Sequence, residues 1–128
     1  MRKLLLLFCL VTFFVSGCIA DNKELPLVGK TYKISDSKGN SARITFNANK
    51  TVNGFSGVNR FFGEFRTAGD NIIFDRMGMT KMAGAPEAMS FEDKFIKALT
   101  QTDRFYEIGH TLTFFSGDMP VLTLKLAE

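Results

Sequence analysis

The sequence contains few of the residues from which small catalytic or metal-binding sites are built. Its 128 residues include two cysteines and one histidine, His110. Zinc sites usually combine several histidine or cysteine ligands, and a catalytic triad needs a histidine held beside a nucleophile. Because His110 follows a glycine between two strand-like segments, we interpret it as a surface turn residue. We therefore expect no metal site, no cofactor and no enzymatic activity.

A long apolar run occurs at the N-terminus, where Leu4–Val15 follow Arg2 and Lys3 and contain Thr12 as their one polar residue. Twelve helical residues reach about 18 Å, whereas the hydrocarbon core of a bilayer is roughly 30 Å thick. The run therefore predicts a signal peptide over residues 1–17 and not a stable transmembrane helix.

The next residues indicate how this signal is processed. Ser16 and Gly17 are small and directly precede Cys18, an order that resembles the lipobox of bacterial lipoproteins. The resemblance implies cleavage between Gly17 and Cys18, a diacylglyceryl thioether on Cys18, and anchoring by two or three acyl chains. Since Ile19 and not aspartate follows the cysteine, the outer membrane facing the periplasm is favoured if the source has two membranes. An ordinary secretory signal and an uncleaved anchor are the alternatives.

Removal of the signal changes both charge and thiol content. It leaves 111 of the 128 residues, and it lowers the formal net charge from +3 to +1 because Arg2 and Lys3 are lost. About 111 residues suit one domain, and a nearly neutral domain argues against a nucleic-acid partner. Cys9 leaves with the signal and Cys18 carries lipid, so we expect no disulfide in the mature chain.

Residues 18–27 are predicted to be a lipidated tether, and residues 28–128 one folded domain. Short segments rich in β-branched and aromatic residues, separated by glycine and asparagine clusters, predict antiparallel strands. The fold class expected is α+β and mainly antiparallel β, a small curved sheet or partly open barrel of about eight strands. The predicted strands are Gly29–Ile34, Ala42–Asn47, Thr51–Ser56, Phe61–Thr67, Asn71–Met77, Arg104–Ile108, Thr111–Phe115 and Val121–Leu126.

One helix is predicted at Pro86–Thr100, because proline suits the first helical turn and Glu87 complements the N-terminal dipole. Apolar residues that should cover one side or end of the sheet recur at helical spacing: Ala88, Phe91, Phe95, Ala98 and Leu99. The polar face is expected to be solvated and carries Glu92, Asp93, Lys94 and Lys97.

Two segments, Gly57–Gly63 and Thr80–Gly84, resemble the paired motifs of the META domain family, which includes HslJ-like bacterial lipoproteins. Ala98–Leu99 resembles the end of the family's helix. The resemblance implies a small, mainly antiparallel β fold with a helix and an association with the envelope or with stress, and it supplies no catalytic residues. The motif positions are Gly57, Val58, Asn59, Gly63, Thr80, Met82, Ala83 and Gly84.

Many family members carry cysteines where this chain has Val58 and Gly84. The resemblance implies that these two positions are neighbours that can form a disulfide in other members, although the disulfide itself does not carry over to this chain. We therefore expect Val58 to lie close to Gly84; Cα atoms more than about 7 Å apart could not be bridged in a relative.

The segment after the first motif offers a candidate contact residue. We expect Phe61 and Phe65 to face the core, which leaves Phe62 on the opposite face as the best candidate for contact with a partner. Three methionines nearby could bind copper(I) through their thioethers, but their spacing favours packing between strand and helix: Met77, Met79 and Met82.

These observations favour a lipid-anchored META-domain protein of the bacterial envelope, which acts as a non-catalytic binding or stress-associated module. Its expected partners are the membrane, through the lipid, and an unknown envelope protein or ligand. An anchored inhibitor of an envelope or host hydrolase, such as a lysozyme or protease, is a second interpretation. A small-ligand carrier is the third, and it requires a cavity inside the sheet.

Overall fold

The computed structural model describes residues 27–127. The predicted signal peptide, its cleavage site at Gly17–Cys18 and the tether up to residue 26 lie outside the described residues.

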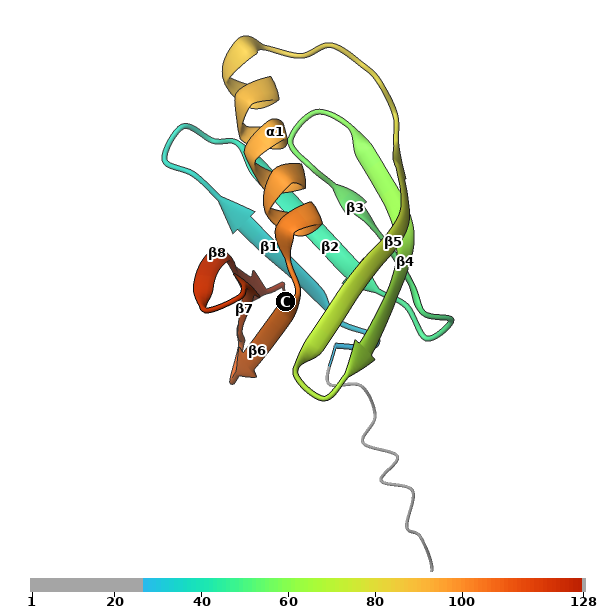
Figure 1. Ribbon diagram of the computed structural model, residues 1–128. Helices are drawn as coiled ribbons and strands as arrows, with labels where there is room; N and C mark the ends of the chain where they lie inside the picture. Colours follow the sequence, from blue (N-terminus) through green and yellow to red (C-terminus); the bar gives the residue numbers. More distant parts are fainter. Residues whose placement is uncertain (1–26, 128) are drawn as a thin grey trace, which may run out of the picture.

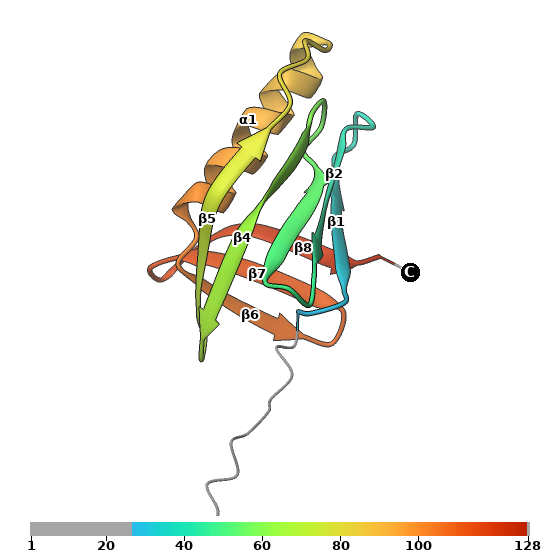
Figure 2. The same ribbon diagram turned by 90° about the vertical axis from the view of Figure 1, so that its right-hand side faces the viewer.

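Eight antiparallel strands form a closed barrel in which each strand pairs with the next and β8 pairs with β1 (Figures 1 and 2). This confirms the predicted fold class, and it shows that the sheet closes completely. Strand ends differ from the predictions by at most two residues. The strands are β1 (Thr31–Ser35), β2 (Ser41–Phe46), β3 (Thr51–Phe55), β4 (Arg60–Ala68), β5 (Asn71–Met79), β6 (Arg104–Ile108), β7 (Thr111–Ser116) and β8 (Met119–Leu126).

The seam between β5 and β6 is the narrowest pairing in the barrel. It contains a single residue pair, Asn71 with Arg104, supported by backbone hydrogen bonds from Ile72 N to Asp103 O and from Phe105 N to Asp70 O. Figure 1 shows α1 (Pro86–Gln101) descending toward the start of β6 on this side of the barrel. The helix thus leads into β6, the strand that has the narrowest pairing with its neighbour.

Aromatic rings fill the barrel interior. Phe61 and Phe65 on β4 are 2% and 0% exposed, whereas Phe62 between them is 58% exposed, so the predicted orientation of all three is confirmed. Phe46 packs edge-on against Phe65 with ring centroids 5.1 Å apart. Tyr32 packs against the same Phe46 ring at 6.1 Å. Such edge-to-face contacts are preferred geometries for aromatic pairs, and they occupy the space along the barrel axis.

Helix α1 begins at Pro86, as predicted, and ends at Gln101. Phe95 and Leu99 are buried, and the Phe95 ring lies 5.7 Å from the ring of Phe61. Glu92 was expected on the solvated polar face, and this expectation is wrong. Glu92 is only 6% exposed and belongs to the buried face of the helix. The other residues of the predicted polar face, Asp93, Lys94 and Lys97, are exposed.

The first described residues are part of the folded domain. Leu27, the last residue of the predicted tether, is fully buried in the core. Three residues later, Lys30 Nζ contacts Glu107 Oε1 on β6 at 2.8 Å. The chain is therefore fixed to the barrel before β1 begins.

Candidate functional site

A buried carboxylate joins α1 to the β3–β4 turn at one end of the barrel. Glu92 Oε2 accepts hydrogen bonds from Ser56 Oγ at 2.7 Å, from Val58 N at 3.0 Å and from Asn59 N at 2.6 Å. Its other oxygen, Oε1, accepts from Asn59 Nδ2 at 2.7 Å. Ser56 and Asn59 are themselves buried, at 0% and 4% exposure. Because four donors converge on the carboxylate, hydrogen bonds from the protein replace those that water would make to it.

Asn59 extends this network to the connection between β5 and α1. Its Oδ1 accepts from Met82 N at 2.6 Å and from Thr80 Oγ1 at 2.9 Å. Its Nδ2 donates to Met82 O at 3.1 Å as well as to Glu92. The amide of Asn59 therefore holds both backbone polar groups of Met82, whose side chain is 64% exposed.

Two glycines of the first motif are required by close packing. Gly57 has φ +128°, and a Cβ there would lie 3.0 Å from Phe91 Cδ1 and 3.2 Å from Ala88 O of the helix. At Gly63 a Cβ would collide with Met77 Sδ and lie 3.1 Å from Asp75 O. Both positions thus lack a side chain because another element occupies the space.

Val58 and Gly84 are in contact, as the family resemblance implied. A Cβ built on Gly84 would lie 3.4 Å from Val58 Cβ and 2.7 Å from Val58 Cγ2. The first separation is close to the Cβ–Cβ spacing of disulfides, about 3.5–4.5 Å. The valine methyl groups therefore occupy the volume that a disulfide would take.

Hydrogen bonding determines the ionisation of Glu92. Burial alone raises its pKa, but the hydrogen bonds from Asn59, Ser56 and the Val58 backbone outweigh burial, and the pKa lies below its ordinary value of 4.5. The group is therefore a stable anion at neutral pH. A carboxylate that is ionised, buried and fully hydrogen-bonded is poorly suited to act as a general acid or base.

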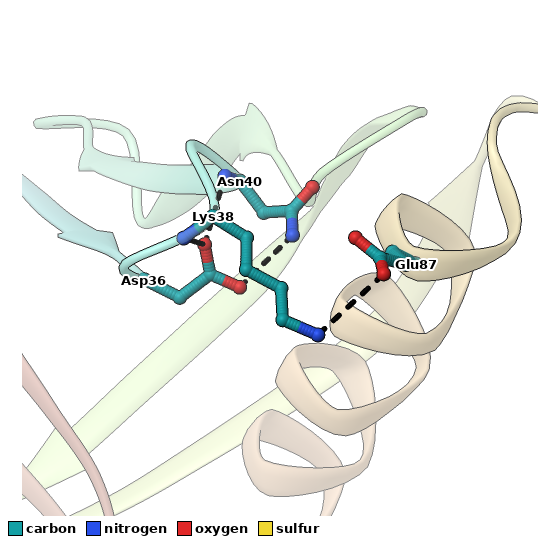
Figure 3. A network of polar contacts seen from close by, with 4 residues as sticks. All are labelled: Asp36, Lys38, Asn40 and Glu87. Atoms are coloured by element: carbon teal, nitrogen blue, oxygen red, sulfur yellow. Dashed lines mark hydrogen bonds and ion pairs between the residues drawn. The ribbon is translucent and has the colours of Figure 1, made fainter.

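A second polar cluster, drawn in Figure 3, joins the β1–β2 turn to the start of α1. Asp36 accepts from Lys38 N, Asn40 N and Asn40 Nδ2, each at 2.9 Å. The Asn40 side chain contributes most to lowering the pKa of Asp36. Lys38 Nζ lies 3.5 Å from Glu87 Oε1, and both side chains are exposed. Exposed ion pairs contribute little stability, so this cluster orders the turn and does not anchor the helix.

The remaining predicted residues lie apart from the buried network. Phe62 lies on the outer face of β4, and its ring covers Gly78, its partner on β5. Met77 and Met79 pack against the core as expected, whereas the expectation of a core position for Met82 is wrong, because Asn59 holds its backbone in the exposed connection. Ala83 is exposed in the same connection, and His110 is exposed in the β6–β7 turn.

Within residues 27–127, no group of three or more histidine, cysteine or acidic side chains is arranged to hold a metal ion. No helix in this part of the chain has the length and apolar character needed to cross a membrane.

Glu92 and Ser56 are the network residues that sequence reasoning missed. Glu92 follows Ala88 by four residues and precedes Phe95 by three and Leu99 by seven. Residues at these spacings share one face of a helix, so its position predicted burial although its charge predicted exposure.

The META domain model matches residues 25–128. The chain belongs to the META domain family. Among solved structures, the chain is similar to an NMR structure of a protein from Burkholderia xenovorans, with a TM-score of 0.65 and 20% sequence identity. The match covers 79% of this chain and 83% of the Burkholderia protein. A second NMR structure has a TM-score of 0.56 and 20% identity and covers 75% and 87% of the two chains. No curated protein matches the chain significantly.

At 20% identity these structural similarities concern the fold alone. In this META domain the polar residues of the two motifs, Asn59 and Thr80, contact each other and Glu92 or its partners. The motifs therefore meet around one buried carboxylate.

Proposed function

We propose that the chain is a lipid-anchored, non-catalytic binding module of the bacterial envelope, with the lipid on Cys18 and a META domain as the binding part. The observation that supports a non-catalytic role is the burial of Glu92 among four hydrogen-bond donors. Its four hydrogen bonds come from Ser56, Val58 and Asn59 and hold α1 to the β3–β4 turn. A catalytic group would need a lone pair or a proton that a substrate can reach.

The anchor is tested by expressing the wild type and Cys18→Ala in a bacterium and analysing the mature N-terminal peptide by mass spectrometry. We expect the wild type to carry a lipid-sized mass increment on Cys18 and to sediment with membranes. The variant should lack the increment. A wild-type chain that is cleaved elsewhere, or that begins at an unmodified Cys18, would contradict the lipoprotein proposal.

One observation supports inhibition of a hydrolase as a second candidate function. The connection from Thr80 to Ala85 is exposed, yet Asn59 fixes both backbone polar groups of Met82 within it. A loop that is fixed in the free protein loses little conformational entropy when it enters an enzyme cleft. Lys81 and Met82 would then be the residues presented to the enzyme.

This second function is tested by mixing the chain with a lysozyme and with a panel of proteases. If the connection inhibits an enzyme, Met82→Asp should weaken inhibition at least about tenfold, because a charge would be buried without a partner. Met119→Asp is the matched control, since Met119 is 68% exposed on β8, outside this connection. Equal loss in both variants, or no inhibition by the wild type, would refute the inhibitor function.

Carriage of a small ligand inside the barrel has less support. The interior is occupied by packed rings, among them Phe46 against Phe65 and Phe74 against Phe114. A ligand would have to displace such contacts, which interiors at native packing density resist.

A further inference from the structure

A row of basic side chains crosses the outer face of the barrel at right angles to the strands. Lys33 on β1 lies opposite Lys125 on β8 and opposite Arg43 on β2. The row continues through Phe55 on β3 to Arg60 at the start of β4. Directly paired residues of neighbouring strands point to the same face of a sheet. All four cations are exposed and Phe55 is half-buried, so the row forms one outward surface.

The cations of this row have no acidic partner within residues 27–127. The ion pairs of the described structure, at separations up to 4.0 Å, involve other basic residues. Lys33 instead faces a cation on each side, Lys125 and Arg43. Like charges directly opposite each other destabilise a sheet. Anionic groups bound along the row would relieve this repulsion.

Uncharged hydrogen-bonding groups lie beside the row. They form a second row, two residues along each strand from the first. In this second row Thr31 on β1 pairs with Thr45 on β2, and Thr45 pairs with Asn53 on β3. A shallow depression lined in part by Lys30, Thr31, Arg43 and Thr45 adjoins the row. Hydroxyl and amide groups can both donate to and accept from the hydroxyls of a sugar.

The curvature of the barrel favours a flexible partner over a flat one. The row passes over β8, β1, β2, β3 and β4, which is half of the way around eight strands (strands labelled in Figure 1). With about 4.8 Å between neighbouring strands, it follows roughly 19 Å of curved surface. A flat membrane would contact one side of this arc, whereas a flexible polymer can follow all of it. Successive nucleic-acid bases would need a series of aromatic platforms, and the row has one half-buried ring, Phe55.

We propose that this row binds a linear anionic polysaccharide, with its charged groups on Lys125, Lys33, Arg43 and Arg60 and its hydroxyls toward Thr45 and Asn53. The proposal goes beyond the binding module described above, because it assigns a surface and a class of ligand. It requires neither the lipid on Cys18 nor the exposed connection at Met82.

The test measures binding of the chain to immobilised polygalacturonate, to poly(dT) and to phosphatidylglycerol vesicles. The chain is held in a phosphatidylcholine nanodisc where Cys18 carries lipid and is free in solution where it does not. We expect binding to polygalacturonate that weakens with added salt. The double variant Lys33→Glu with Arg43→Glu should weaken it at least about tenfold, since two contacts become repulsive. Arg66→Glu with Lys97→Glu is the matched control: it changes the net charge equally at exposed positions away from the row and should change affinity less than about threefold.

Two further comparisons separate the alternatives. Lys125→Glu and Arg60→Glu, at opposite ends of the row, should each weaken polygalacturonate binding if the polymer follows the arc. A urea unfolding curve shows whether each variant is folded. If Lys33→Glu with Arg43→Glu does not fold, the neutral double variant Lys33→Gln with Arg43→Gln is measured in its place.

The proposal is overturned by equal losses in the row variant and its control, or by absence of polygalacturonate binding. Tighter binding of poly(dT) would make a nucleic acid the partner. Preference for phosphatidylglycerol vesicles, with an effect at one end of the row only, would make it a membrane.

Discussion

Replacing Glu92 with glutamine is predicted to destabilise the domain by about 3 kcal/mol at neutral pH. The glutamine amide oxygen can take the place of Oε2 and keep three donors. Its NH₂ group then faces Asn59 Nδ2, which donates to Oε1 in the wild type. Asn59 cannot turn its amide around, because its Oδ1 already accepts from Met82 N and Thr80 Oγ1. The Asn59 N–H that donated to Oε1 and the new glutamine NH₂ thus both lack an acceptor at this contact, and an unpaired buried donor costs about 1–3 kcal/mol.

The other hydrogen bonds to Glu92 lose the assistance of its charge, which roughly doubles the strength of such bonds. Together these effects give the estimate of about 3 kcal/mol, equivalent to a fall of about 10–20 °C in melting temperature for a domain of this size. The assay is urea unfolding followed by far-ultraviolet circular dichroism. Asp93→Asn is the control: it removes the same charge from an exposed neighbour on the same helix and should change stability by less than about 0.5 kcal/mol.

The effect of Glu92→Gln should also depend on pH. Because the folded-state pKa of Glu92 lies below its ordinary value of 4.5, its ionisation stabilises the fold above pH 4.5, and this contribution is lost as the pH falls through the folded-state pKa. The gap between wild type and variant should therefore narrow in acid. A variant as stable as Asp93→Asn at neutral pH, or a gap that stays constant down to pH 3, would refute the reasoning.

The remaining predictions concern packing. Val58→Cys with Gly84→Cys should form a disulfide, visible as a mobility shift between reduced and oxidised samples, and raise stability by up to about 3 kcal/mol; failure to oxidise would show that the two positions are farther apart than their contact indicates. Phe61→Ala should cost about 3–5 kcal/mol in urea unfolding because the ring is buried, whereas Phe62→Ala should cost less than about 1 kcal/mol; equal costs would contradict their opposite orientations. Leu27→Ala should cost about 2–4 kcal/mol, and no change in the same assay would place residue 27 outside the core.

The strands were predictable because a half-buried strand must alternate. In Ala42–Asn47 the apolar residues fall on every second position, and the structure buries Ala42, Ile44 and Phe46. Closure of the barrel could not be predicted in the same way. It depends on the registers of β1 with β8 and of β5 with β6, pairings between segments far apart in the sequence.

The burial of Glu92 escaped prediction for a different reason. A charged residue on a helix is usually solvated, because burial of an isolated charge is costly. The cost is offset here by donors from a turn more than thirty residues earlier in the chain. Only the folded structure brings Ser56 and Asn59 to the helix, so the sequence shows the position of Glu92 on the apolar face but not its partners.

The buried network also explains why the family motifs indicate a fold more readily than an activity. Asn59 and Glu92 bind each other and fix neighbouring backbone, and neither is exposed to a partner. Under the two binding proposals above, recognition uses exposed residues outside the network, such as Arg43, or exposed residues that it positions, such as Met82. Substitution at Glu92 should consequently weaken every binding activity together with stability. Substitution at Arg43 or Met82 should weaken only the proposed binding activity that uses that residue and leave the fold intact, so the two kinds of variant distinguish the buried scaffold from the binding surfaces.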